Sequence, residues 1–224
     1  VIGVARGSDK KTIIYQEHHF KHPNNIEEVR YISPDNKILA IKFIDYKKSL
    51  INPSFQQKNT LAKEVSQAYW QDNKLHVIFG PNDSSPDKAI ISDFLPNDEK
   101  FVIDAGFDHF IRLNWYDLVK GKRIEYDFLL ASRFKTFGMY IKQTACKKLS
   151  LEPNSLLDNK DICFTTDLTN PLLRIITDPI YLRYDSSTQN LVQFIGISNI
   201  NDVEGNSYNV NITYTYPLPK KNNK

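Results

Sequence analysis

Several signals that identify enzymes are absent from this chain of 224 residues. It contains none of the patterns G-x-S-x-G, G-x-x-x-x-G-K-[ST], H-E-x-x-H or C-x-x-C. Glycine is also scarce: its 8 residues are about half of the usual share of ~7%, so little material is available for phosphate-binding loops. We therefore expect no cofactor and no metal site, and we favour a non-enzymatic protein.

Long apolar runs and a strong charge imbalance are missing as well. No run approaches the ~20 residues that a membrane-spanning helix needs. The net charge is only +3, and the one dense basic run is the tail 220–224, which we expect to be solvated and disordered. Basic residues do not interleave with aromatic ones as RNA-binding sheets require. These features predict no nucleic-acid partner, and they leave the oligomeric state open.

Only two cysteines are present, Cys146 and Cys163, and they flank a polar, turn-rich stretch. In an oxidising compartment they could form a disulfide that closes this excursion, and two unpaired buried thiols are the alternative. The chain begins at Val1 instead of methionine, which a removed secretion signal or a trimmed sequence would both explain. We slightly favour the disulfide.

Alternation of apolar and polar residues, which is typical of strands, is the commonest pattern in the chain. It is clearest over residues 209–216 and recurs over 124–130 and 75–79. Residues 37–46 are apolar on both faces for part of their length, which indicates a more buried strand. Turn-forming residues separate the runs at Ser33–Asn36, Gln71–Lys74, Asp185–Asn190 and Asn201–Asn206. About ten short strands joined by local turns should form a sheet that curls.

One segment, from Asp104 to Lys120, has the period of a helix. Its apolar residues are three or four positions apart and form a stripe of Phe107, Phe110, Ile111, Trp115, Leu118 and Val119. Asp104 is a suitable N-cap, and Asp108 and Arg112 could pair one turn apart. Residues 170–176 could form either a shorter helix or a strand.

These patterns predict a mainly β protein with one domain at 1–219. Its fold should be a curled antiparallel sheet, a half-barrel or incomplete barrel, packed around one central amphipathic helix. The helix has to bury its apolar stripe, and the concave face of the sheet is the natural place.

Three stretches carry a resemblance to known proteins. They are Asp104–Asp108 continuing to Phe110 and Trp115, Asp178–Asp185 continuing to Gly196–Ile200, and Tyr15–His18. Together they resemble a family of uncharacterised bacterial proteins that are usually exported, which implies a periplasmic or otherwise exported location. The insert at Cys146–Cys163 is peculiar to this chain. More remotely, the expected fold is similar to the half-barrel of bacterial lipoprotein-localisation factors, which bind acyl chains in a hydrophobic concavity.

The leading functional hypothesis is therefore non-enzymatic binding of an apolar, lipid-like or acyl ligand between sheet and helix. Candidate ligand contacts are Trp115 and Tyr126 as apolar walls, Arg133 as an anion contact, and Glu17 with His18 as polar groups. The alternative is an envelope scaffold or protein-interaction module, which could use a sheet edge or the Cys146–Cys163 excursion.

A third hypothesis is a hydrolase-like enzyme in which Glu17, His18 and the pair Asp104 and Asp108 meet in one cleft. A metal site at His18, His19 and His22 is disfavoured, because His18 and His22 are about 13 Å apart along a strand and His19 points to the other face, with Glu17. We assign structural roles in turns and at strand ends to Asp178, Asp185, Ser198 and Asn199.

Overall fold

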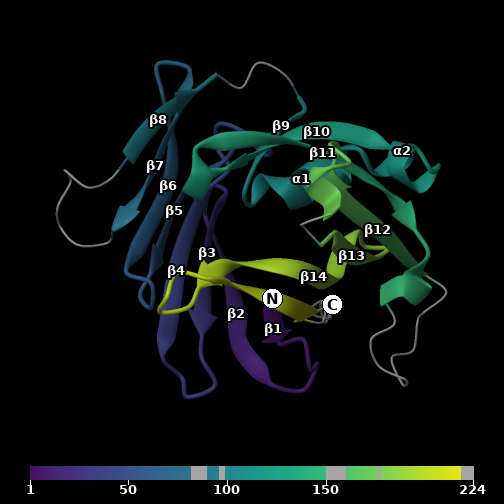
Figure 1. Cartoon of the computed structure of the whole chain (residues 1–224), viewed down its shortest axis with the longest axis horizontal. Helices are drawn as coiled ribbons and strands as arrows, with labels where there is room; N and C mark the ends of the chain where they lie inside the picture. Colours follow the sequence, from purple (N-terminus) through teal and green to yellow (C-terminus); the bar gives the residue numbers. More distant parts are fainter. Residues whose placement is uncertain (82–89, 96–98, 150–159, 176–177, 218–224) are drawn as a thin grey trace, which may run out of the picture.

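The computed structural model describes residues 1–81, 90–95, 99–149, 160–175 and 178–217. Their main element is one curled sheet (Figure 1). The strands of its first half are β1 Ile2–Arg6, β2 Ile13–His22, β3 Ile26–Ile32, β4 Ile38–Asp45, β5 Ser54–Asn59, β6 Glu64–Gln71, β7 Lys74–Pro81 and β8 Ile90–Phe94. The strands of its second half are β9 Phe101–Ile103, β10 Ile124–Leu130, β11 Lys135–Thr144, β12 Asp161–Leu168, β13 Ile180–Asp185, β14 Asn190–Asn201 and β15 Ser207–Thr215. Residues 220–224, the expected tail, lie outside the described part.

The sheet consists of two meanders that meet where β1 pairs with β15. Its strand order is β8-β7-β6-β5-β4-β3-β2-β1-β15-β14-β13-β12-β11-β10-β9, with 15 described strands instead of the ten or so expected. All neighbours are antiparallel except β9 and β10. The predicted curled, mainly antiparallel sheet is confirmed. It is open, because the end strands β8 and β9 are not hydrogen-bonded to each other.

The parallel pair β9 and β10 explains where the helices are. Parallel neighbours need a long crossover connection, and here that connection is α1 (Gly106–Leu113) followed by α2 (Trp115–Val119). The single central helix expected over Asp104–Lys120 is therefore wrong. The break falls at Asn114, whose side-chain amide donates a hydrogen bond to the carbonyl of Phe110 at 2.9 Å and so competes with the helical backbone.

Two other local expectations need correction. Asp104 does not cap the helix, because the cap residue is Ala105 and no side chain bonds there. Of the two alternatives for residues 170–176 the helix is present, but it is only the short 3₁₀ helix Leu173–Ile175. The expected ion pair of Asp108 with Arg112 is present, with Nε to Oδ2 at 2.9 Å.

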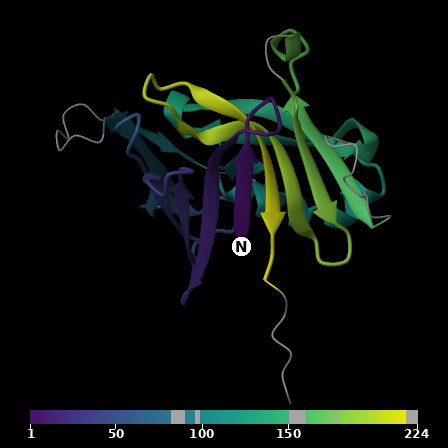
Figure 2. The same ribbon diagram turned by 90° about the horizontal axis from the view of Figure 1, so that it is seen from below.

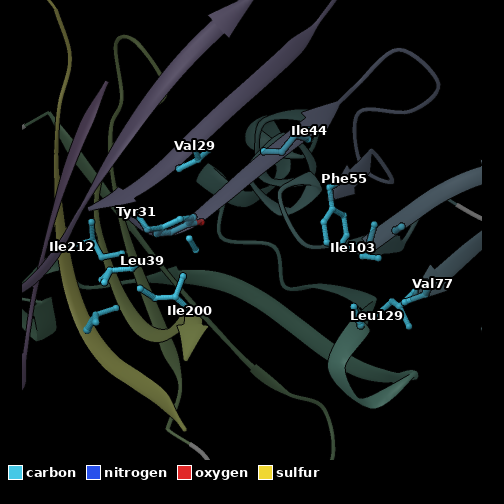
Figure 3. Packing of buried hydrophobic residues seen from close by; sticks show 14 of the residues in the cluster. Val29, Tyr31, Leu39, Ile44, Phe55, Val77, Ile103, Leu129, Ile200 and Ile212 are labelled. Atoms are coloured by element: carbon cyan, nitrogen blue, oxygen red, sulfur yellow. The ribbon is translucent and has the colours of Figure 1, made fainter. Parts of the chain in front are cut away.

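The sheet rolls over itself so that β9 and β10 have two buried faces. Val102 and Phe128 are register partners on the face beneath the helices. Ile103 and Leu129 are partners on the opposite face, where they pack against residues of β5–β7. Ile103 lies beside Phe55, and Leu129 lies beside Val77 (Figure 3). Apolar side chains thus hold the open sheet in its rolled shape, since no hydrogen bonds join the end strands β8 and β9.

Candidate functional site

The inner face of the roll carries a group of charged side chains that we call the His19 cluster: Glu17, His19, Glu27 and Tyr214. The imidazole of His19 bonds Glu27 through Nδ1 at 2.8 Å and Glu17 through Nε2 at 3.2 Å. The hydroxyl of Tyr214 donates to the same Glu17 oxygen at 3.0 Å. Strand alternation places Glu17 and His19 on one face of β2, and register places Glu27 and Tyr214 on that face from β3 and β15.

The two carboxylates control the charge of His19. Burial lowers the pKa of this imidazole, but the hydrogen bonds and charges of Glu17 and Glu27 outweigh burial and raise the pKa to about 9. For Glu27, burial raises the pKa and the bond from His19 lowers it, with a net lowering. His19 is therefore a cation at neutral pH that ties β2 to β3.

The charge of His19 predicts a pH dependence of stability. The folded pKa of about 9 exceeds the unfolded value of 6.5, so the stabilisation is complete below pH 6.5 and is lost as the pH rises through 9. We expect the free energy of unfolding to fall by about 2 to 3 kcal/mol over this window. His19→Gln should remove that slope. Urea titrations of both proteins at several pH values measure it, and equal slopes would contradict the prediction.

A second group, the Asp108 cluster, fastens helix α1 to the sheet. Asp108 accepts a hydrogen bond from the Tyr184 hydroxyl of β13 at 2.9 Å through Oδ1, and its Oδ2 binds Arg112. Burial, and then the charge of Asp108, raise the pKa of Tyr184 well above its ordinary value, so the phenol remains a donor. Burial lowers the pKa of His109, and the charges of Asp108 and Glu27, one from each cluster, act in the opposite direction. Its ring centroid lies 4.7 Å from that of Tyr46.

The third charged contact is a buried ion pair between Lys42 and Asp104. Lys42 points inward from β4, and its side chain is only 2% exposed. Asp104 has a left-handed backbone, with φ of 46°, at the junction of β9 and α1. Gly106 follows at a point where a Cβ atom would lie 2.0 Å from the carbonyl oxygen of Ile51. The stretch Asp104–Asp108 thus joins three tertiary contacts, and Asp108 links it to Tyr184 in the stretch Asp178–Asp185.

The space between the helices and the sheet is filled by aromatic rings. Trp115 contacts Phe164 and Tyr184, each with 5.5 Å between ring centroids. Tyr126 stacks on Phe107 at 5.7 Å, and its hydroxyl bonds Thr166 at 2.7 Å. Trp115 and Tyr126 therefore lie together in this core.

Two open hollows in the described part of the chain lie elsewhere, on the surface of the β4–β7 region. One, of about 650 Å³, lies between the β5–β6 turn and the end of β7, where Ala62, Glu64 and Phe79 line it. The other, of about 520 Å³, lies beside the β6–β7 turn, where Lys48, Trp70 and Asp72 line it. Neither includes Trp115 or another residue of the helix–sheet core.

The remaining residues singled out in the sequence are dispersed. His18 lies on the outer face of β2, where its Nε2 is 3.1 Å from the amide oxygen of Gln16, so it does not join Glu17. Arg133 is exposed in the 3₁₀ helix Ala131–Arg133. Cys146 and Cys163 are joined by a disulfide. The five proposed ligand contacts therefore do not form one site.

The polar residues assigned to turns and strand ends have the following contacts. Asp185 accepts bonds from Ser187 and Thr188, which lower its pKa to about 2. Ser198 is buried and accepts the Tyr15 hydroxyl at 3.1 Å. The carbonyl of Asn199 accepts Gln57 at 2.6 Å. Asp178 is exposed, two residues before the start of β13.

The sequence analysis did not identify three interior polar groups: the charged side chains of Glu27 and Lys42 and the phenol of Tyr214. Strand alternation could have indicated them, because residues two positions apart point to the same face of a strand. Glu27 is two positions from the buried Val29, and Lys42 lies between the inward-facing Ala40 and Ile44. Among the described residues no group of His, Cys, Asp and Glu could hold a metal ion. No helix in the described ranges is long and apolar enough to cross a membrane.

The fold defines a mainly β protein with a rolled sheet. No family model and no curated protein matches the chain. Among solved structures it is similar to the beta-barrel-like protein of domain of unknown function DUF1849 from Brucella abortus, with 9% sequence identity and a TM-score of 0.41 over 95% of this chain and 92% of that one. That protein is itself of unknown function, as is the family that the sequence resembles. A similarity of this degree assigns no ligand or activity.

Proposed function

We propose that this chain is a non-enzymatic interaction module that binds a partner protein on the outer face of strands β1–β4. The observation that carries the proposal is the contrast between the two faces of the sheet. Inside, charged groups are paired with one another and rings fill the space below the helices. Outside, large apolar side chains face solvent on adjacent strands.

Strand register defines this surface, the outer apolar face: Ile2, Phe20, Ile38, Ile41 and Phe43. Phe20 and Phe43 flank Glu28 in one row, and they are 40% and 48% exposed. Ile2 and Ile41 belong to the next row. Figure 2 shows the N-terminal strands (purple) beside the C-terminal strand (yellow) in the middle of the sheet, where β1 pairs with β15. Apolar side chains gathered on one face are typical of protein contact sites.

The charges of this face indicate the chemistry of the partner. Its carboxylate Glu28 is buried and is bound by Arg30 at 2.5 Å and by His22 at 3.1 Å. Arg30 and Lys58 are exposed cations of the same face. A partner segment with acidic groups beside apolar side chains would complement this pattern.

The acyl-ligand and hydrolase hypotheses would each require a rearrangement of the folded structure. An apolar or acyl ligand between sheet and helix would have to displace rings such as Trp115 and Phe164. A hydrolase would need His18 and Glu17 in one cleft, and they lie on opposite faces of β2. Location remains a proposal too: a disulfide persists in oxidising compartments, which supports export.

Site-specific photo-crosslinking tests the proposal. A photoreactive residue at Phe43 should give a single discrete adduct in source cells, and Phe20→Ser in the same chain should reduce its yield. The matched control is Tyr116, which is 68% exposed on α2. Equal adducts from both positions would contradict a specific surface. Native mass spectrometry covers the ligand alternative: extra mass that is lost on denaturation and identified as lipid would favour the acyl-ligand candidate.

A further inference from the structure

Three cationic side chains converge on one tyrosine ring on the outer face of the second half of the sheet. The guanidinium carbon of Arg123 lies 4.0 Å from the centroid of the Tyr140 ring, and that of Arg174 lies 5.2 Å away. The Lys142 ammonium is 5.8 Å from the same centroid. They come from three places: the residue before β10, strand β11 and the 3₁₀ helix Leu173–Ile175.

The local carboxylates neutralise only part of this group. Glu125, opposite Tyr140 in β10, binds Arg123 at 2.7 Å. Asp167, opposite Tyr140 in β12, accepts a backbone bond from Leu168. Within the described residues, neither Lys142 nor Arg174 forms an ion pair. In this part of the chain, Lys142 and Arg174 are thus two like charges without a described ion-pair partner beside the same ring, so the arrangement favours a counter-anion.

Arg174 supplies a second, independent observation. One of its terminal nitrogens donates to the carbonyl of Thr169 at 2.7 Å, which holds the guanidinium in place. Its Nε is buried and has no hydrogen-bond partner in the described structure. A buried donor without an acceptor is costly, and an anion at this edge of the guanidinium would supply one.

We propose that Arg123, Lys142 and Arg174 form a binding site for a phosphate group at Tyr140. Two planar guanidinium groups and one ammonium match the three acceptor oxygens and the double charge of a phosphate monoester better than the two oxygens of a carboxylate. The phosphate could belong to a free ion or to a lipid headgroup. A lipid headgroup is supported by Leu172, which is 74% exposed two residues from Arg174 and could contact the apolar part of a membrane surface.

The full chain is titrated with inorganic phosphate at low ionic strength by calorimetry, and it is tested separately for cosedimentation with phosphatidylcholine vesicles with and without phosphatidic acid. We expect saturable binding of at least one phosphate probe, weakened about tenfold or more by Lys142→Gln or Arg123→Gln. Lys142 and Arg123 are exposed, so these variants should fold, which circular dichroism checks. Lys11→Gln, an exposed loop variant of equal charge change, is the control and should bind as the parent does.

The results distinguish a free phosphate ion from a lipid headgroup and test whether the site binds phosphate at all. Binding of inorganic phosphate supports a site for a free anion. Cosedimentation only with phosphatidic acid, reduced by Leu172→Ser as well as by Lys142→Gln, supports a lipid headgroup at the same cations. Absence of binding to both probes, or equal weakening by Lys11→Gln, would overturn the proposal. Photo-crosslinking at Phe43 is independent of all these results.

Discussion

Lys42→Ala should lower the free energy of unfolding by about 3 to 5 kcal/mol, which is the largest effect that we expect from a single substitution. The ammonium is buried, pairs with Asp104 and lies 5.2 Å from the centroid of the Phe55 ring. Its removal leaves the Asp104 carboxylate, which is 19% exposed, without its partner. Urea denaturation followed by circular dichroism measures the loss.

The double variant Lys42→Met with Asp104→Asn is the matched control. It removes both charges and keeps the volume of the lysine stem, so it should recover most of the stability lost in Lys42→Ala. Lys58→Ala, on the outer face of the neighbouring strand β5, should cost less than about 0.5 kcal/mol because that lysine is exposed. A loss below about 1 kcal/mol for Lys42→Ala would show that water replaces the ion pair.

Removing the disulfide between Cys146 and Cys163 should have the second largest effect, about 3 kcal/mol. The bond closes a loop with a sequence separation of 17 residues between the end of β11 and strand β12. Its loss increases the entropy of the unfolded chain. The midpoint of thermal unfolding should fall by about 6 to 12 °C, given 2 to 4 °C per kcal/mol for a chain of this size.

Two measurements distinguish the effect of losing the disulfide bond from the effect of replacing the two cysteine side chains. The double variant Cys146→Ser with Cys163→Ala removes the disulfide. Alanine is used at Cys163 because that residue is 1% exposed, and a buried serine would add an unpaired hydroxyl. The parent chain in reductant should show the same midpoint as this variant. If reductant leaves the parent unchanged, or if the intact mass does not lack two hydrogen atoms, the cysteines are not bonded and the prediction fails.

Much of the sheet could be predicted because its strands follow a local rule. Apolar and polar residues alternate over 124–128 of β10, whose bounds match the predicted strand, and Leu129 departs from the pattern because it is buried on the opposite face. The turn at Asp72 and Asn73 also has a local cause, since both residues adopt positive φ as hairpin turns require. The helical stripe was visible for the same reason, and all six of its apolar residues pack in the core between the helices and strands β9–β13.

The interior polar contacts could not be predicted from spacing. Glu17 and His19 share a face by alternation, but Glu27 and Tyr214 reach them only through the pairing of β2 with β3 and of β1 with β15. Lys42 and Asp104 are 62 residues apart and meet because β9 lies inside the roll. The cations around Tyr140 likewise come from separate elements.

The sequence by itself determined the class of the fold: strand alternation, turn residues and one apolar helical stripe depend on neighbours within a few positions. The tertiary structure decided the rest. It packed β9 and β10 against β5–β7 and paired buried charges across the roll. The physical reason is that an open sheet with one apolar face has several ways to curl, and only the packing of distant side chains selects one.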